Sequence, residues 1–456
     1  MIDRFVMFGL AVLLSADVQL LPILGSRTPY AIVVPLALLA YRAAVIRCTL
    51  SPAYRQVVGG ILRRAASSPM HAILLSLFTL MLVVSFMRGA SAGTLDLVGA
   101  TLLVVKWTSI IILLFSIVVS GELRSEESTL IRATIVSLFV FNLANATLFA
   151  AGVTNTVAAA QYVGAQEPGI MFGLLGMNIP RAAPPLAAGI NTAGLQAAVG
   201  LAVGLVLALR MARFKYRVLA VVLAGASTLM ILLADSRGAM LAGLGAAALA
   251  LLLPGMLKLR AKWLAITVPV LPVVLIVVLQ SLSNQSWLSD FSRSGTSSVA
   301  LLTGRPFIWA SILASLATFR LDHLFGFGAL GQITAGVSAQ YGIFFAKNYA
   351  SPYTMGAHNA LLQAILDVGY VGALIQVALL WYLLRYFGRS DSDDRTRRWW
   401  TDAGLAGTLC LLLLGITGET FSFTTPITLL LFLVLNVHCL TVPRSLPMQS
   451  PSPEAP

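Results

Sequence analysis

Long apolar segments constrain this chain more than any other feature. The hydrocarbon core of a bilayer is about 30 Å thick and an α-helix rises about 1.5 Å per residue, so a spanning helix needs about 20 mainly apolar residues. Apolar residues make up 58% of the chain and charged residues only 10%, values typical of a protein that lies mostly in lipid. Twelve segments are long and apolar enough to span: residues 5–23, 29–46, 70–88, 96–120, 127–151, 187–209, 216–233, 237–254, 262–281, 358–384, 402–420 and 424–441. We therefore expect an all-α polytopic membrane protein with about twelve transmembrane helices.

The distribution of positive charge predicts the orientation of these helices. Lys and Arg gather on the cytoplasmic side of membrane proteins. Here they cluster after the second, sixth, eighth and tenth predicted spans, within residues 47–64, 210–217, 258–262 and 385–398. With this helix count every cluster falls on one side, and both termini lie on that side too. The net charge of +13 is therefore interpreted as a topology signal, because no soluble domain is present to carry a nucleic-acid surface. We take the first apolar segment as an uncleaved anchor.

The chain is expected to form a single integral membrane domain over residues 1–441, followed by a disordered Pro- and Ser-rich tail at 442–456. Two outer loops are longer than a turn requires, at about 152–186 and 282–357. The second joins the ninth and tenth predicted spans and is the largest non-spanning segment. Within it, residues 306–319 show helical spacing of apolar residues after a proline, which predicts a short helix that packs on the bundle or lies against the membrane.

Arginines on the outer side are exceptional, because positive residues normally stay inside. Arg237 follows Asp235 in a turn of a few residues and opens a predicted span. A cation at a helix N-terminus opposes the helix dipole, so something anionic should lie nearby. Asp235 is one candidate partner. The other is an external anion held by Arg237 together with the free N–H groups of the helix start.

Arg181 and Arg305 lie beside Pro and Gly residues that allow a ligand to approach the backbone closely. The planar guanidinium group forms bidentate, charge-assisted hydrogen bonds to phosphate, so three of them suit a diphosphate. The outer acidic residues show no Asp-x-Asp pair of the kind that holds Mg²⁺; they are Glu167, Asp235, Asp290, Asp322 and Glu419. The sequence therefore favours a site that needs neither a metal ion nor a cofactor.

His358 stands at the start of an otherwise apolar helical run, "AHNALLQAILDVGYVG". An imidazole with a pKa near 6.5 can act as a general base at neutral pH, although a histidine here can also be an interface anchor. Asn359 is expected to orient His358 or to cap the helix. Asp367 lies about 13 Å deeper along the helix, too far to touch His358, and is expected to make a structural polar bond. His323 in the outer loop is the second candidate for a base.

Four motifs in this order resemble the O-antigen ligase and O-antigen polymerase superfamily of bacterial inner membranes. They are "SRG" at 236–238, "TGRPFIW" at 303–309, "LFGFG" at 324–328 and "AHNALLQAILDVGYVG" at 357–372. "RAAPPLAAGINTAG" at 181–194, which contains Asn191, resembles an earlier Arg…Asn…Gly segment of that superfamily. Pro184 and Pro185 depart from it, since many members carry Gly there. The resemblance covers about residues 180–375.

The resemblance implies a GT-C-like, inverting glycosyltransferase. Such proteins take a glycan from undecaprenyl diphosphate at the periplasmic face and transfer it to an acceptor hydroxyl. The arginines of the family motifs match Arg181, Arg237 and Arg305, which would hold the diphosphate, and the family histidine matches His358, the catalytic base. Asp235, Asn191, Asn359 and Asp367 are expected to support them.

The acceptor stays open between two alternatives. A ligase would use lipid A core and a polymerase would use another glycan chain; the large loop before His358 and the twelve predicted spans favour a ligase slightly. A third reading is a transporter or flippase for a lipid-linked sugar. Transport predicts charged or broken helices near the membrane midplane, for which only Lys106 and Asp367 qualify.

Overall fold

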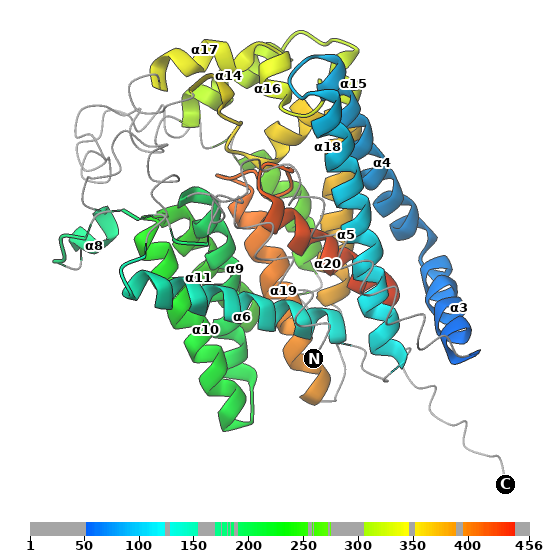
Figure 1. Ribbon diagram of the computed structural model, residues 1–456, viewed down its shortest axis with the longest axis vertical. Helices are drawn as coiled ribbons and strands as arrows, with labels where there is room; N and C mark the ends of the chain where they lie inside the picture. The colour runs from blue at the N-terminus through cyan, green and yellow to red at the C-terminus, as the bar shows by residue number, and fades with distance from the viewer. Residues whose placement is uncertain are drawn as a thin grey trace.

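The computed structural model describes residues 52–123, 128–153, 169–174, 176–179, 181–182, 184–186, 190–253, 258, 260–271, 274, 305–345, 352–388 and 395–442 (Figure 1). All regular secondary structure within these ranges is helical. The predicted spans at 5–23 and 29–46 and the tail beyond residue 442 lie outside the described residues. Residues 154–168 of the first predicted loop and residues 275–304, which include the start of the second, also lie outside them.

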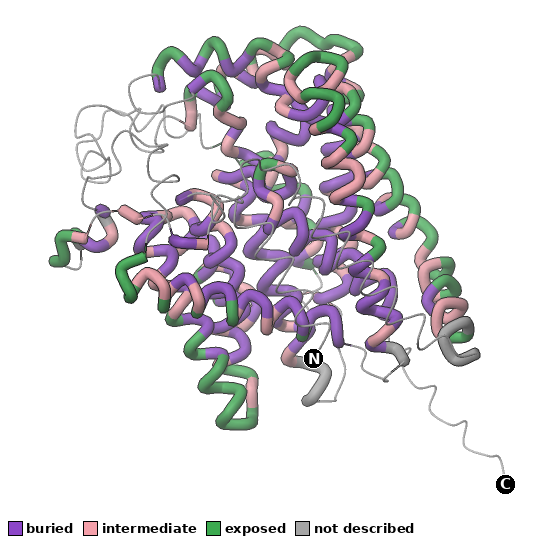
Figure 2. Tube along the Cα trace, in the orientation of Figure 1, coloured by how far each residue is buried: buried purple, intermediate pink, exposed green. Residues whose placement is uncertain are grey.

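Six helices are long and apolar enough to cross a membrane: α4 (Pro69–Ser91), α5 (Leu97–Leu123), α6 (Thr129–Ala150), α9 (Ile190–Arg210), α10 (Phe214–Leu233) and α18 (Ala360–Phe387). Each coincides with a span predicted from the apolar pattern. Their apolar faces meet in a common core in the middle of the bundle, where α9 packs on α10, α11 (Arg237–Leu252) and α19 (Arg395–Leu414) (Figure 2). The chain is therefore an all-helical membrane protein.

Other predicted spans appear as shorter apolar helices: α11, the helix Ala261–Leu271, α19 and α20 (Pro426–Thr441). At about 1.5 Å per residue, the 16 residues of α11 extend about 24 Å, less than a full hydrocarbon core. The prediction for 402–420 was wrong in its bounds, because α19 begins at Arg395 and ends at Leu414. Residues 415–425 instead form a turn between α19 and α20, which we call the 415–425 turn.

Residues 305–345, which belong to the longest predicted loop, fold into a helical layer across one end of the bundle, which we call the cap (Figure 1). It contains α14 (Arg305–Leu316), α15 (Asp322–Phe325), α16 (Gly331–Thr334) and α17 (Val337–Phe345). The short helix predicted after Pro306 is thus confirmed as α14. Ile308, Trp309 and Ile312 of α14 are buried together with Leu362 and Leu366 of α18, so this helix packs on the bundle.

Helix α18 is interrupted at Gly369, where φ is 75° and ψ is −178°. The interruption is filled by the "LFGFG" loop of the cap. The N–H groups of Phe327 and Gly328 donate to the carbonyls of Leu366 and Asp367, at 2.7 and 3.2 Å, and so satisfy acceptors that the broken helix leaves open. A Cβ on Gly369 would overlap the carbonyl oxygen of Leu324, so both segments need this glycine.

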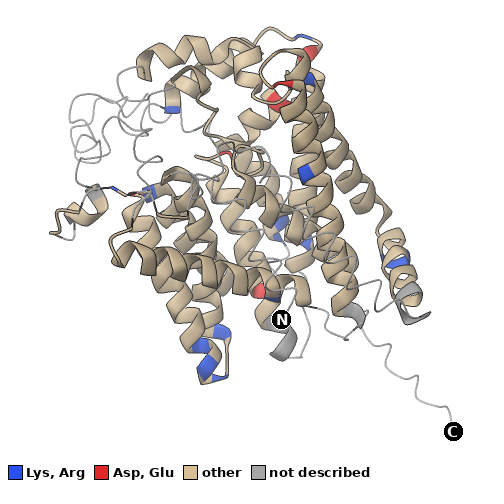
Figure 3. Ribbon diagram, viewed as in Figure 1, with Lys and Arg blue, Asp and Glu red and all other residues tan. Residues whose placement is uncertain are grey.

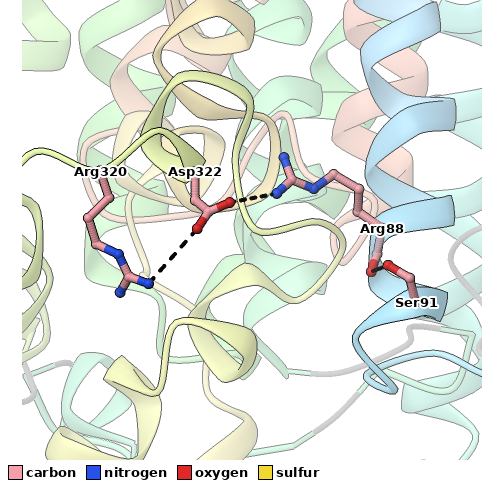
Figure 4. A network of polar contacts seen from close by, with 4 residues as sticks. All are labelled: Arg88, Ser91, Arg320 and Asp322. Carbon is pink, nitrogen blue, oxygen red and sulfur yellow. Dashed lines mark hydrogen bonds and ion pairs between the residues drawn. The ribbon is translucent and has the colours of Figure 1, made fainter.

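The cap is also fixed to α4 by polar contacts (Figure 4). Arg88 near the end of α4 donates through Nη2 to Oδ1 of Asp322 at 3.0 Å, and Arg320 lies 3.9 Å from the other carboxylate oxygen. The N–H of Ala329 donates to the carbonyl of Ser85. At the opposite end of the molecule, the turn between α9 and α10 carries a cluster of basic residues (Figure 3). The positive cluster and the cap therefore lie at opposite ends of the bundle, as the charge pattern predicts.

Candidate active site

The start of α18 places His358 just before the helix. Asn359 is the N-cap: its Oδ1 accepts from the N–H of Leu362 at 2.9 Å, and its Nδ2 donates to the carbonyls of Gly415 and Ile416 at 3.1 and 3.0 Å. Of the two roles that the sequence leaves open for Asn359, the structure shows the helix cap. His358 has φ +47°, in the left-handed region that few non-glycine residues adopt. Such residues persist where their surroundings hold them, and they cluster at active sites.

Side chains from α18 and from the 415–425 turn hold the backbone around His358. Gln363 accepts from the N–H of Ala357 at 2.8 Å. Oε1 of Glu419 accepts from the N–H of His358 at 3.1 Å. The indole Nε1 of Trp309 donates to the carbonyl of Ala357 at 3.0 Å. The imidazole is thus carried on a backbone segment that is fixed on several sides.

Asp367 is buried below this segment and forms structural bonds, as the sequence suggests. Its Oδ1 accepts from the N–H of Gly331 and from Nε2 of Gln363, both at 2.9 Å. Gln363 also donates to Oε1 of Gln332, whose own side chain reaches the carbonyl of Thr354. Asp367 therefore fixes the cap against α18 and is connected to the His358 segment through Gln363.

Arg305 opens α14 and lies close enough to His358 to influence its ionisation. Desolvation lowers the pKa of the half-buried His358 imidazole, and the positive charge of Arg305 lowers it further. The structure thus brings together two of the residues predicted for the site, although they are far apart in the sequence. The neutral imidazole that results is the form that can accept a proton.

Arg181, Asp235 and Arg237 form a second group at the junction of α10 and α11. The guanidinium of Arg181 donates through Nε and Nη2 to the carbonyl of Ala234, at 3.3 and 3.1 Å. Asp235 has φ +47°, and its Oδ1 accepts from the N–H of Met171 in the short helix α8 (Ile170–Leu174) at 3.1 Å. Arg237 is the first residue of α11, as the sequence predicts.

Asn191 belongs to the same neighbourhood. It is the second residue of α9, and Gly194 one turn later packs on the N-cap of α11: a Cβ on Gly194 would lie 2.7 Å from Cβ of Ser236. Residues three apart share a helix face, so Asn191 lies on the side of α9 that approaches the α11 start.

The 415–425 turn connects the two groups. While Glu419 binds the backbone of His358, Thr417 lies against the start of α11, where its Oγ1 would be 3.1 Å from a Cβ on Gly238. Gly418 packs on Leu195 of α9. The starts of α9, α11 and α18 therefore surround one turn, with Arg237 as the first residue of α11 and His358 just before α18.

Glu419 is the residue that sequence reasoning missed. The sequence places it among the outer acidic residues, near the end of the predicted span at 402–420, and assigns it no role. An acidic residue within an apolar segment is itself a signal, because such residues are costly in a membrane and usually functional. The second candidate base, His323, is fully buried among Phe319, Phe327 and Tyr370, and its Nδ1 accepts from the N–H of Arg320.

An apolar cavity of about 300 Å³ opens beside the candidate site. Its walls come from α14, from the first half of α18 and from the end of the helix Ala261–Leu271; they include Trp309, Leu313, Leu361, Leu362 and Val270. Trp309 lies one turn after Arg305, and Leu361 follows His358 closely in the chain. A charged group near Arg305 and an apolar chain in this cavity could thus belong to one ligand.

Within the described ranges, no three His, Cys, Asp or Glu side chains come together as a potential metal site. Residues 220–377 match the family model described as O-antigen ligase. The match includes Arg237, Arg305 and His358 and confirms the resemblance over this range, whereas the motif at 181–194 lies before it. No curated protein matches the chain.

Proposed function

We propose that this chain, whose residues 220–377 belong to the O-antigen ligase family, is an inverting glycosyltransferase that takes its glycan from undecaprenyl diphosphate. The proposal includes a site at the periplasmic face of a bacterial inner membrane and both termini in the cytoplasm. The single observation that carries it is the contact between the starts of α14 and α18, where Trp309, one turn after Arg305, donates to the carbonyl of Ala357 beside His358. A base and a diphosphate-binding cation are the two groups that this transfer requires.

In the proposed reaction, an acceptor hydroxyl oxygen attacks the anomeric carbon of the bound glycan. The bond between that carbon and the diphosphate oxygen breaks, and its electron pair leaves with undecaprenyl diphosphate. His358 accepts the hydroxyl proton, and attack opposite the leaving group inverts the anomeric centre. Arg181, Arg237 and Arg305 hold the diphosphate and stabilise the charge that develops on it, so no metal ion is needed.

The apolar cavity supports a lipid-linked donor. A polyprenyl chain needs an apolar wall beside the diphosphate site, and the cavity walls formed by Leu313, Leu361 and Leu362 are close in sequence to Arg305 and His358. Burial of apolar surface contributes about 25 cal/mol per Å², so a few isoprene units in this cavity would add substantially to donor affinity.

Among the acceptors, we propose lipid A core, which makes the protein a ligase for surface polysaccharide. The description of the matched family favours this choice over a polymerase that uses the same donor. A deletion strain distinguishes them. A ligase deletion leaves unmodified lipid A core and accumulates long lipid-linked glycan, whereas a polymerase deletion leaves core with a single repeat or removes a secreted polysaccharide.

Transport of a lipid-linked sugar is the less favoured function. A broken helix is a feature of many transporters, and α18 is broken at Gly369. Here the freed carbonyls of Leu366 and Asp367 accept from backbone N–H groups of the cap, so the break serves to join cap and bundle.

Arginine variants test the proposal. Arg237→Ala and Arg305→Ala should each lower glycan transfer at least about 100-fold, since each removes a charge that stabilises the leaving diphosphate. Arg320→Ala is the matched control, because Arg320 is an exposed cap arginine that pairs weakly with Asp322. The measurement is the amount of glycan-bearing lipid A core in cells with equal membrane levels of each variant. Wild-type transfer by both Arg237→Ala and Arg305→Ala would contradict the diphosphate site.

A further inference from the structure

The 415–425 turn contains a buried acidic side chain that the reaction described above does not use. Glu419 is only 7% exposed. Its Oε1 accepts from the N–H of His358 at 3.1 Å, and its Oε2 accepts from Oγ1 of Thr424 at 2.7 Å. Both carboxylate oxygens are therefore engaged, one of them by the backbone of the candidate base.

Both the backbone and the side chain of Glu419 are held by neighbouring groups. Oγ1 of Thr425 donates to the backbone carbonyl of Glu419, and the N–H of Ser422 donates to the same oxygen at 3.1 Å. Gly356 lies directly against the carboxylate, where a Cβ would overlap Oε1. Oγ of Thr424 also bonds to Oγ of Ser422, whose other partner is Asp367 at 3.5 Å. Glu419 thus belongs to a rigid polar cluster that joins the turn to α18.

The backbone of His358 needs such a support. Its φ of +47° is unfavourable for a residue with a Cβ, and contacts must hold it there. Among the described residues, Glu419 is the one side chain that accepts from the N–H of His358 itself.

We propose that Glu419 is a positioning residue for His358: its carboxylate fixes the left-handed backbone of His358 and thereby aims the imidazole at the acceptor hydroxyl. This inference rests on the proposed function, in which His358 is the base. Glu419 lies outside the matched range of 220–377 and does not contact the substrate in this scheme. A displacement of about 1 Å in a reacting group can cost about 100-fold in rate, so loss of this support should reduce kcat rather than donor binding.

Three substitutions of Glu419 separate positioning from charge. Glu419→Ala removes the acceptor. Glu419→Asp keeps the charge but withdraws the carboxylate by one methylene. Glu419→Gln keeps an oxygen for the N–H of His358, and its amide can donate to Thr424. Thr420→Val is the control, because Thr420 is buried in the same turn and its hydroxyl bonds to Leu411, away from His358.

The assay uses the full chain in proteoliposomes with labelled undecaprenyl-diphosphate-linked glycan as donor and lipid A core as acceptor, and it follows the release of undecaprenyl diphosphate. We expect kcat to fall about 30-fold or more in Glu419→Ala and about 10-fold in Glu419→Asp, with donor KM within about 3-fold of wild type. Glu419→Gln and Thr420→Val should stay within about 3-fold of wild-type kcat. Variants are compared at equal amounts of folded protein, judged by elution from a size-exclusion column at the wild-type volume. Glu419→Asp replaces Glu419→Ala if the alanine variant does not fold.

Two results would overturn the inference. One is wild-type kcat in Glu419→Ala or, if that does not fold, in Glu419→Asp. The other is a Glu419→Gln variant as impaired as Glu419→Ala, which would mean that the charge or a proton of Glu419 is needed. His358→Ala in the same assay separates the inference from the proposed function. If His358→Ala is inactive while Glu419→Ala is active, only the positioning role fails; if His358→Ala is active, the proposed function fails.

Discussion

His358 combines a strained backbone with an environment that keeps its side chain neutral. Desolvation and the Arg305 guanidinium both disfavour the imidazolium form, so the pKa of His358 lies below its usual value near 6.5. A base is active in its deprotonated form, which is populated above its pKa. Lowering the pKa therefore extends the active range towards lower pH, and Arg305 contributes to this range in addition to its proposed role in diphosphate binding.

The pH profile of glycan transfer tests this electrostatic arrangement. We expect the acid limb of kcat to lie below pH 6.5, with nearly constant kcat between pH 6.5 and 7.5, because His358 stays neutral throughout that interval. The measurement is kcat against pH at saturating donor. A half-maximal point at or above pH 6.5 would show that burial and the charge of Arg305 do not lower the pKa of His358.

The individual site residues were predictable to different degrees. Arg237, Arg305 and His358 stand in motifs that the sequence displays directly, and the Asn359 cap follows from its place before an apolar run. Glu419 could not be assigned because its partner His358 lies 61 residues away in the sequence, and only the fold brings the two together.

At the scale of elements, α18 differs most from its prediction. The apolar pattern at 358–384 continues through Gly369 without interruption, and an isolated glycine within a helical pattern does not by itself predict a break. The break depends on the "LFGFG" loop, more than 40 residues earlier, which supplies donors to the freed carbonyls. Local apolar periodicity predicted where helices occur, but this long-range pairing decided how one of them is divided.

A glycine replacement tests the joint between α18 and the cap. Gly369→Ala should destabilise the protein by several kcal/mol, since it combines the cost of a positive φ with an overlap against Leu324. Gly225→Ala is the control: Gly225 lies within α10 with open space around its Cα, so alanine should be neutral or slightly stabilising. Thermal unfolding in detergent measures both. Equal Tm values for the two variants would contradict the described packing of Gly369.

At the scale of the whole molecule, the apolar helices and the charge distribution agree. The basic turn between α9 and α10 and the cap lie at opposite ends of the bundle (Figures 1 and 3). Composition and periodicity predicted the class and most helices, because a bilayer permits few alternatives. The end of α19 at Leu414 was missed because the next residues, "GITGET", form a buried turn that is fixed by Asn359 and packs on Leu195, both distant in the sequence.

Cysteine labelling tests the predicted orientation. In a chain whose natural cysteines are replaced, Arg320→Cys in the cap should react with a membrane-impermeant maleimide in intact spheroplasts. Arg213→Cys, in the turn between α9 and α10, should react only after permeabilisation. Labelling of Arg213→Cys from outside would reverse the orientation and would place the candidate site in the cytoplasm.

The central claim is that His358 is the base of a metal-independent glycan transfer. The most direct measurement uses purified wild-type and His358→Ala protein in proteoliposomes, with labelled undecaprenyl-diphosphate-linked glycan, lipid A core and EDTA. Wild-type protein should release undecaprenyl diphosphate as labelled glycan appears on the core, and His358→Ala should be slower by at least about 100-fold while binding the donor normally. Wild-type rates in His358→Ala, or loss of wild-type activity in EDTA that Mg²⁺ restores, would contradict the claim.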